Sequence, residues 1–202
     1  LIQEAQSALR NAKLSGKNRF EFFRNDEAEF SSMKKHFKLR NDLRKAIIEN
    51  QFEVYYQPLV KLKEGSVESL EALIRWNHPE FGMVNPLEFI PIAEETGLII
   101  DLGDWILKDI CIQYNQWKEK GIGNIKISLN ISSIQFSERN FVDKLIETIE
   151  GFKISPSSFI VEITESVLIS NINKIREDMK RLQNFGIKIA LDDFGTGFSS
   201  LM

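Results

Sequence analysis

From residue 52 onward, strand-like and helix-like segments alternate regularly, and this alternation constrains the fold more than any other feature. Apolar runs indicate strands, whereas apolar residues spaced three and four apart indicate amphipathic helices. Strands that alternate with helices form a parallel sheet covered by helices, either an open doubly wound sheet or a closed barrel. The predicted strands are Phe52–Val60, Val67–Trp76, Ile125–Ile131, Phe159–Thr164 and Ile187–Asp192. The predicted helices are Pro86–Glu95, Asp101–Lys120, Asn140–Glu150 and Ile172–Phe185.

Connection lengths refine this α/β class. Only six residues separate the first two strands, too few for a parallel crossover, so we expect the first strand to be antiparallel to the second. A complete (β/α)₈ barrel takes about 250 residues, and residues 37–202 supply five strands, about two thirds of one. Because the chain also begins at Leu1 without an initiator Met, we expect a piece of a longer protein that is marginally stable alone.

The first fifty residues have a different pattern. Leu1–Leu14 predicts an amphipathic helix, Arg19–Phe23 a short strand, and Met33–Asn50 a second helix. The polar segment Arg24–Ser32 lacks periodicity and is interpreted as a linker.

Composition excludes several classes of protein. Apolar residues make up 43% and charged residues 27%, which is ordinary for a globular protein and argues against fibrous or disordered chains. Cys111 is the single cysteine, so a disulfide framework and a Cys-based zinc site are excluded. No apolar run reaches the roughly 18 residues of a membrane span, and the start lacks a signal peptide. We therefore expect a cytoplasmic segment without membrane contact, although the parent protein could be anchored upstream.

Charge is unevenly distributed along the chain. Residues 1–50 carry a net charge of +4 and residues 51–202 carry −7. An acidic body is a poor surface for the phosphates of duplex nucleic acid, so duplex nucleic acid is not expected as a partner. Clustered carboxylates can instead hold a divalent metal that meets a phosphate.

Acidic and amide side chains lie within or at the ends of the predicted strands. Glu71 interrupts an apolar strand, Asn130 ends the third strand, Glu162 lies between Val161 and Ile163, and Asp192 and Asp193 end the fifth. In a parallel barrel the C-terminal strand ends meet at one face, where active sites form. A single buried Glu is more often a structural ion-pair partner, but five such groups on consecutive strands favour a site. An all-oxygen set suits Mg²⁺ or Mn²⁺, and the adjacent aspartates could serve two ions.

Several residues near these acids could have either a functional or a structural role. The glycine-containing loop after Asp193 is either an ordinary turn or a mobile gate over the site. Arg75 shares a strand face with Glu71, and either binds a phosphate or neutralises that carboxylate. His78 before Pro79 is interpreted as structural, and Trp105 and Trp117 as core packing rather than a platform for bases.

A series of short motifs runs through residues 37–202: Tyr56-Gln57-Pro58, Glu71-Ala72-Leu73 with Arg75-Trp76 and His78-Pro79, Phe89-Ile90-Pro91 with Ala93-Glu94, Gly97-Leu98-Ile99, Asn130 with Ser132 and Gln135-Phe136, Glu162-Ile163-Thr164-Glu165-Ser166, and Asp192-Asp193-Phe194-Gly195-Thr196-Gly197. In kind and order these motifs resemble the EAL domain family of cyclic di-GMP phosphodiesterases, whose fold is a TIM-type (β/α)₈ barrel with its first strand antiparallel.

The resemblance implies a role for each matched residue. Glu71, Asn130, Glu162 and Asp192 would be ligands of one or two Mg²⁺ or Mn²⁺ ions, and Glu71 would also be catalytic. Asp193 would serve the second metal or the attacking water, as a catalytic residue. Arg75, Gln57 and Leu73 would bind substrate. Glu165 would brace the loop of Phe194, Gly195, Thr196 and Gly197, which couples the metal site to a dimer interface in this family.

Residues 1–23 resemble a different family. Ala12-Lys13, Gly16 and Asn18-Arg19-Phe20 are similar to the end of a GGDEF (diguanylate cyclase) domain. The expected organisation is therefore a GGDEF tail over residues 1–23, a linker over residues 24–36 and the N-terminal part of an EAL domain over residues 37–202.

The implied function is hydrolysis of cyclic di-GMP to linear pGpG by a metal-activated water, in bacterial second-messenger signalling, by an intact protein that forms a homodimer. The family's catalytic Lys and its remaining Glu and Gln would follow Met202, so the segment alone is expected to be inactive. One alternative is an inactive EAL domain that senses cyclic di-GMP or docks another protein. A metal-dependent barrel hydrolase of another kind is a further alternative.

Overall fold

The computed structural model describes residues 2–14, 27–122, 125–164 and 172–192. The chain divides into two compact units, Leu1–Leu43 and Arg44–Met202.

The described residues of the first unit are helical. Helix α1 spans Ile2–Leu14, as predicted, and α2 spans Glu27–Ile48, so its last turns belong to the second unit. Helix α2 begins before the predicted start, and residues 27–36 of the expected linker are helical. Ala and Glu favour helices even without an apolar stripe, which explains the early start. The predicted strand Arg19–Phe23 lies outside the described residues.

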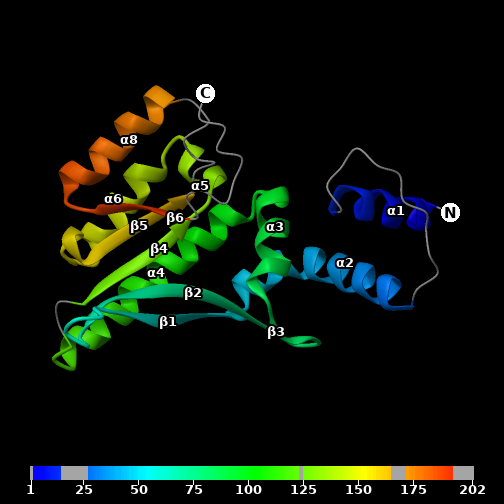
Figure 1. Ribbon diagram of the computed structural model, residues 1–202, viewed down its shortest axis with the longest axis horizontal. Coiled ribbons are helices and arrows are strands. Elements are labelled where there is room, and N and C mark those ends of the chain that lie inside the picture. The colour runs from blue at the N-terminus through cyan, green and yellow to red at the C-terminus, as the bar shows by residue number, and fades with distance from the viewer. Residues whose placement is uncertain (1, 15–26, 123–124, 165–171, 193–202) are drawn as a thin grey trace. The chain divides into compact units, whose positions relative to one another are not determined.

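The second unit contains a mixed sheet (Figure 1). Its strands are β1 Phe52–Val60, β2 Val67–His78, β3 Gly82–Val84, β4 Lys126–Ile131, β5 Phe159–Thr164 and β6 Lys188–Asp192. The order is β1-β2-β4-β5-β6, and β3 pairs with β2. Strand β1 is antiparallel to β2, whereas β2, β4, β5 and β6 are parallel neighbours. The predicted antiparallel first strand and the predicted parallel sheet are thereby confirmed. The short strand β3, which forms a hairpin with β2, was not predicted.

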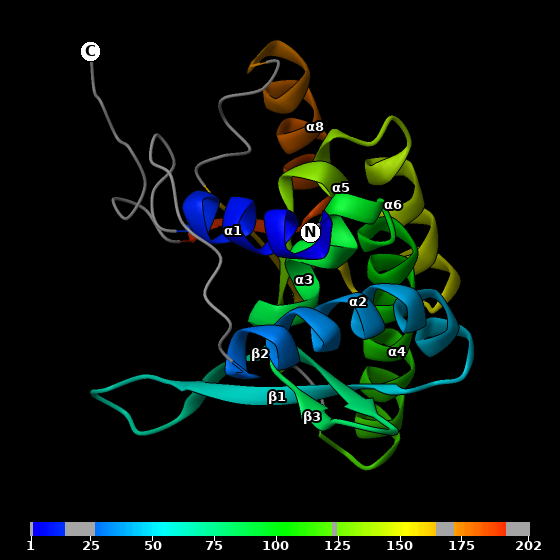
Figure 2. The same ribbon diagram turned by 90° about the vertical axis from the view of Figure 1, so that its right-hand side faces the viewer.

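Helices connect the parallel strands. They are α3 Pro86–Thr96, α4 Ile99–Glu119, α5 Ser133–Ser137, α6 Phe141–Gly151, the 3₁₀ turn η1 Pro156–Ser158 and α8 Ile172–Phe185. Figure 2 shows α4 beside α6, which it contacts. The longer helices match the predicted ones within two residues at each end. The short elements α5 and η1 were missed, because one turn shows no apolar periodicity.

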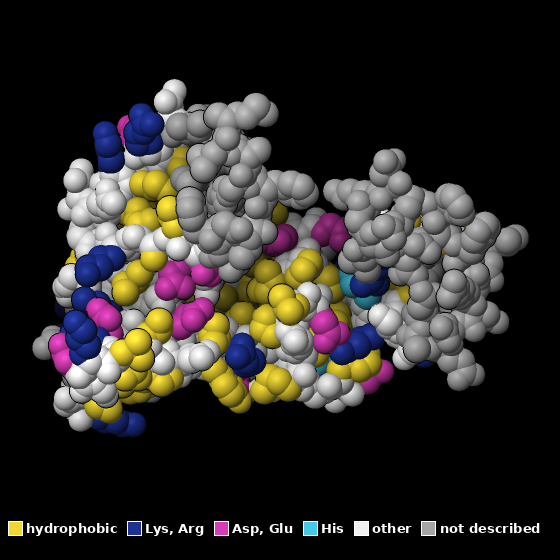
Figure 3. Space-filling model, in the orientation of Figure 1, with side chains coloured by type: hydrophobic (Ala, Val, Ile, Leu, Met, Phe, Trp, Pro, Cys, Tyr) yellow, Lys and Arg dark blue, Asp and Glu magenta, His cyan; other side chains and the backbone are white. Residues whose placement is uncertain are grey.

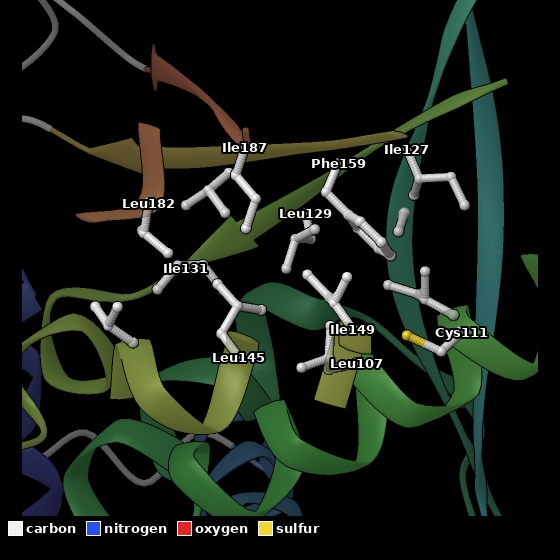
Figure 4. Packing of buried hydrophobic residues seen from close by; sticks show 14 of the residues in the cluster. Leu107, Cys111, Ile127, Leu129, Ile131, Leu145, Ile149, Phe159, Leu182 and Ile187 are labelled. Atoms are coloured by element: carbon white, nitrogen blue, oxygen red, sulfur yellow. The ribbon is translucent and has the colours of Figure 1, made fainter. Parts of the chain in front are cut away.

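The hydrophobic core lies between the sheet and its covering helices. Leu107 and Cys111 of α4 and Leu145 and Ile149 of α6 point toward the strands (Figure 4). The sheet contributes alternate residues to this core, among them Ala72, Ile127, Leu129, Phe159, Val161 and Ile163. Trp117 packs partly buried on the core, and the Trp105 ring lies 6.0 Å from that of Phe52, which confirms the packing role of both indoles.

No helix within the described ranges is long and apolar enough to cross a membrane.

Candidate active site

The residues between the core positions of the strands carry the site. Glu71 pairs with Ser128, Asn130 pairs with Glu162, and Asp192 pairs with Thr164. Because side chains alternate along a strand and directly paired residues point the same way, these side chains share one face of the sheet. This face is opposite the one that packs on α4 and α6. The four predicted ligands Glu71, Asn130, Glu162 and Asp192 therefore lie on four neighbouring parallel strands and on a common face.

Two of these residues make direct contact. The Asn130 Nδ2 donates a hydrogen bond of 2.9 Å to Glu71 Oε1, and so links the end of β4 to the middle of β2. Since the nitrogen of the amide points to Glu71, the Asn130 oxygen remains an acceptor.

Negative charge accumulates around Glu162. Burial raises the pKa of the Glu162 carboxyl, and the charges of Glu71 and Asp192 raise it further. The Ser128 hydroxyl lowers this pKa, although Ser128 Oγ forms no hydrogen bond of ordinary geometry within the described part of the chain. Neither Glu71 nor Glu162 forms an ion pair with a basic side chain in the described part of the chain.

This donor set fits a hard divalent cation in its chemistry. Carboxylate and amide oxygens are the ligands that Mg²⁺ and Mn²⁺ prefer, and the accumulated negative charge favours a cation. Within residues 2–14, 27–122, 125–164 and 172–192, however, no three His, Cys, Asp or Glu side chains come together as a metal-binding group. The further predicted ligand Asp193 lies outside the described residues, as do Glu165, Phe194, Gly195, Thr196 and Gly197.

A pocket of about 290 Å³ opens beside the acids. Its wall is mostly hydrophobic, and Figure 3 shows acidic side chains next to a hydrophobic hollow in this face of the unit. The strands supply Leu73, Arg75, Asn130, Glu162 and Thr164, and helices α3, α4 and α5 supply the opposite wall. Two predicted ligands and two predicted substrate-binding residues therefore border one cavity.

Arg75 has contacts that bear on its two predicted roles. Its Nη1 donates a 2.8 Å hydrogen bond to the Ile74 carbonyl, and its Cζ lies 5.6 Å from the centre of the Tyr55 ring. It forms no ion pair with Glu71, so the structure lacks the neutralising contact.

Gln57 is exposed and is the cross-strand partner of Glu71. It therefore lies on the same face as the acids, but it does not line the pocket.

His78 has the structural role expected of it. The side chain is buried, and Nδ1 accepts hydrogen bonds from the backbone N–H groups of Glu80 at 3.1 Å and Phe81 at 3.3 Å. The ring thereby stabilises the turn between β2 and β3.

Three pocket residues received no role from the sequence. Ser132 and Gln135 form a capping box at the start of α5, where each side chain bonds the other's backbone N–H. Their Ser-x-x-Gln spacing was a usable signal. Glu94 lines the pocket from α3. Its place could have been predicted from the sequence, because Glu94 continues the four-residue spacing of Pro86 and Ile90 on one face of the helix.

Comparison with known proteins gives a consistent family assignment. The EAL domain profile matches residues 40–202. The bifunctional diguanylate cyclase/cyclic di-GMP phosphodiesterase MucR of Pseudomonas aeruginosa is 35% identical over 202 residues, which cover all of this chain and 29% of MucR. The cyclic di-GMP phosphodiesterase PdeR of Escherichia coli is 36% identical over 201 residues, which cover all of this chain and 30% of PdeR.

A solved structure of the PaMucR phosphodiesterase in complex with c-di-GMP superposes with a TM-score of 0.76 at 37% identity. The match covers 81% of this chain and 66% of that one. The chain thus spans less than a third of the length of these two curated relatives. It forms part of the TIM-type barrel that EAL structures share. With the profile matched over most of its residues, the chain belongs to the EAL domain family.

Proposed function

We propose that this segment is part of a metal-dependent phosphodiesterase that hydrolyses cyclic di-GMP to linear pGpG in bacterial second-messenger signalling. The observation that carries the proposal is the common face of Glu71, Asn130, Glu162 and Asp192 beside a pocket that Arg75 also lines. The similarity to MucR and PdeR supports the proposal, because both proteins are named as cyclic di-GMP phosphodiesterases.

The four side chains would hold Mg²⁺ or Mn²⁺, with Asp193 on a second ion or on the attacking water. A divalent cation at such a site supplies Lewis-acid activation of water and of a phosphodiester. Arg75 would bind a substrate phosphate, because a guanidinium matches phosphate geometry and this one has no carboxylate partner among the residues described. Leu73 would contact the nucleotide within the pocket, and Gln57 would approach it from β1.

Glu165 and the loop of residues 194–197 would couple this site to a homodimer interface. For residues 1–23 we propose the end of a GGDEF domain, and for residues 24–36 a connection to the EAL domain. The match to MucR supports this organisation, because it covers the whole chain, including the residues that precede the EAL profile at residue 40. A cytoplasmic location follows from this proposal.

The test incubates the intact purified protein with cyclic di-GMP and Mn²⁺ or Mg²⁺ and follows pGpG by chromatography. Glu71→Gln should lower the rate at least about 100-fold, since it removes a ligand charge at the metal. Glu68→Gln is the matched control, because Glu68 is an exposed glutamate of the same strand and should leave the rate unchanged.

A second candidate is a domain that binds cyclic di-GMP without hydrolysing it. Metal-dependent binding of cyclic di-GMP without pGpG formation would replace the first proposal with this one. Absence of binding by a folded protein would exclude both.

A further inference from the structure

Two contacts restrain the Arg75 side chain and leave most of its hydrogen-bond donors available. Its Nη1 donates a 2.8 Å hydrogen bond to the Ile74 carbonyl, and its Cζ lies over the Tyr55 ring, 5.6 Å from the ring centre. A cation within about 6 Å of the centre of an aromatic ring is attracted by the negative face of the ring. A guanidinium has five N–H donors, and the contact with Ile74 engages one of them.

The register of the sheet brings Tyr55 to Arg75. Strand β1 is antiparallel to β2, with Tyr55 opposite Leu73 and Glu53 opposite Arg75. Tyr55 and Arg75 are therefore diagonal neighbours on one face, a separation that aromatic and long side chains bridge. Glu71 precedes Arg75 by four residues on β2, so this is also the face of the acids of the candidate site.

Arg75 has a neutral partner although an acidic one is adjacent. Glu53 is the direct cross-strand neighbour of Arg75, yet no ion pair joins them within the described ranges. A carboxylate partner would neutralise the guanidinium and compete with an anionic ligand for its donors. The face of a ring attracts the cation without doing either. Tyr55 therefore restrains Arg75 and preserves its positive charge.

This restraint favours the binding of an anion by Arg75. An arginine side chain has many rotamers, and fixing them at the moment of binding lowers the affinity. The contacts with Tyr55 and Ile74 fix part of these rotamers beforehand. Arg75 also borders the same pocket as Asn130 and Glu162, two of the proposed metal ligands.

We propose that Tyr55 is a positioning residue that holds the Arg75 guanidinium in place for a phosphate of cyclic di-GMP. The inference rests on the proposed function, in which Arg75 binds that phosphate, and it adds the residue that orients Arg75. Tyr55 acts through Arg75 and not through a contact of its own with the ligand.

A double-mutant cycle on the intact protein tests this inference. Equilibrium binding of cyclic di-GMP is measured in EDTA and, for hydrolysis, KM and kcat are measured with Mn²⁺. The cycle consists of wild type, Tyr55→Leu, Arg75→Gln and the double variant. Tyr55→Phe keeps the ring, and Glu53→Gln is the control that changes the exposed neighbour of Arg75 on the same strand. Circular dichroism and the urea midpoint verify that each variant is folded.

Tyr55→Leu should weaken the binding of cyclic di-GMP about 2- to 5-fold, as expected for the loss of a cation–π contact at an exposed site. Tyr55→Phe should restore most of this affinity, and Glu53→Gln should not weaken binding. In the Arg75→Gln background, Tyr55→Leu should have no further effect, because its action requires the guanidinium. KM should rise by the same factor while kcat is retained, since the phosphate is held in the ground state and in the transition state alike.

Three results would overturn the inference and leave the proposed function intact: no loss of affinity in Tyr55→Leu, the same loss in Tyr55→Phe, or an equal loss in the Arg75→Gln background. The last result would show that Tyr55 acts independently of Arg75. Failure of folded wild type to bind cyclic di-GMP, in EDTA and with Mn²⁺, would instead overturn the proposed function and this inference with it.

Discussion

Replacing Tyr56 with Phe should stabilise the protein, although it removes a hydroxyl group. Tyr56 lies on β1, and its ring packs edge-on against Trp117 with 4.7 Å between the ring centres. The Oη atom is buried and has no hydrogen-bond partner among the residues that the structure describes. A buried polar group without a partner costs about 1–3 kcal/mol. Phe keeps the ring contact and removes this cost, so we expect the free energy of unfolding to rise by about 1–2 kcal/mol.

The matched control is Tyr114→Phe, for which the opposite sign is expected. The Tyr114 hydroxyl is hydrogen-bonded to Ser158 Oγ at 2.8 Å in a buried environment. Its loss leaves Ser158 without this partner and should cost about 1 kcal/mol. Urea unfolding followed by tryptophan fluorescence measures both variants, and an unchanged slope against urea verifies that the comparison is valid. If Tyr56→Phe destabilises the protein as much as Tyr114→Phe does, the reasoning is refuted.

The Tyr56 hydroxyl also makes the free energy of unfolding depend on pH. Burial raises the pKa of Tyr56 above its ordinary value of 10.0, and the charge of Asp109 raises it further. A raised pKa in the folded state means that the native protein holds this proton more tightly than the unfolded chain does. The resulting stability is complete below pH 10 and is lost as the pH rises above it. Stability measured from pH 8 to pH 11 should therefore fall less steeply in Tyr56→Phe than in wild type.

Two further changes have expected outcomes. A Cβ at Gly103 would lie 2.0 Å from Gln135 Nε2, so Gly103→Ala should displace the buried Gln135 and cost about 1–2 kcal/mol in urea unfolding. The cost should be smaller in a Gln135→Ala background, and equal costs in both backgrounds would contradict the clash. Burial raises the pKa of the Cys111 thiol to about 12, so a thiol reagent at pH 8 should modify Cys111 only on unfolding. Rapid modification of the native protein would show that this part of the core opens locally.

Much of the fold could be predicted because the strands and helices have strong local signals. Strands β1 and β5 and helix α8 have the predicted bounds, since runs of apolar residues end there at polar or turn residues. The early start of α2 and the strand β3 were missed, because neither depends on an apolar periodicity. Glu27–Ser32 is helical without an apolar stripe, and β3 exists only through its pairing with β2.

The candidate site likewise has features that the sequence predicts and features that only the tertiary structure shows. Glu71, Asn130 and Glu162 could be selected from the sequence, because a polar residue inside or at the end of an apolar strand is costly to bury without a hydrogen-bond or charge partner. Their common face follows from strand alternation once the strands are known to be parallel. The side-chain contact of Asn130 with Glu71 depends on the register between β2 and β4, which only the sheet reveals.

Sequence by itself determined the order of the elements, the antiparallel first strand and the acidic set, because these depend on local periodicity and short connections. Only the tertiary structure decided that Arg75 contacts Tyr55 rather than Glu71, that Gln135 packs against Gly103, and that Glu94 borders the same pocket as Glu162. Each of these relations joins residues whose side-chain positions are set by packing between elements. Packing depends on the shape and register of whole faces, which no short stretch of sequence contains.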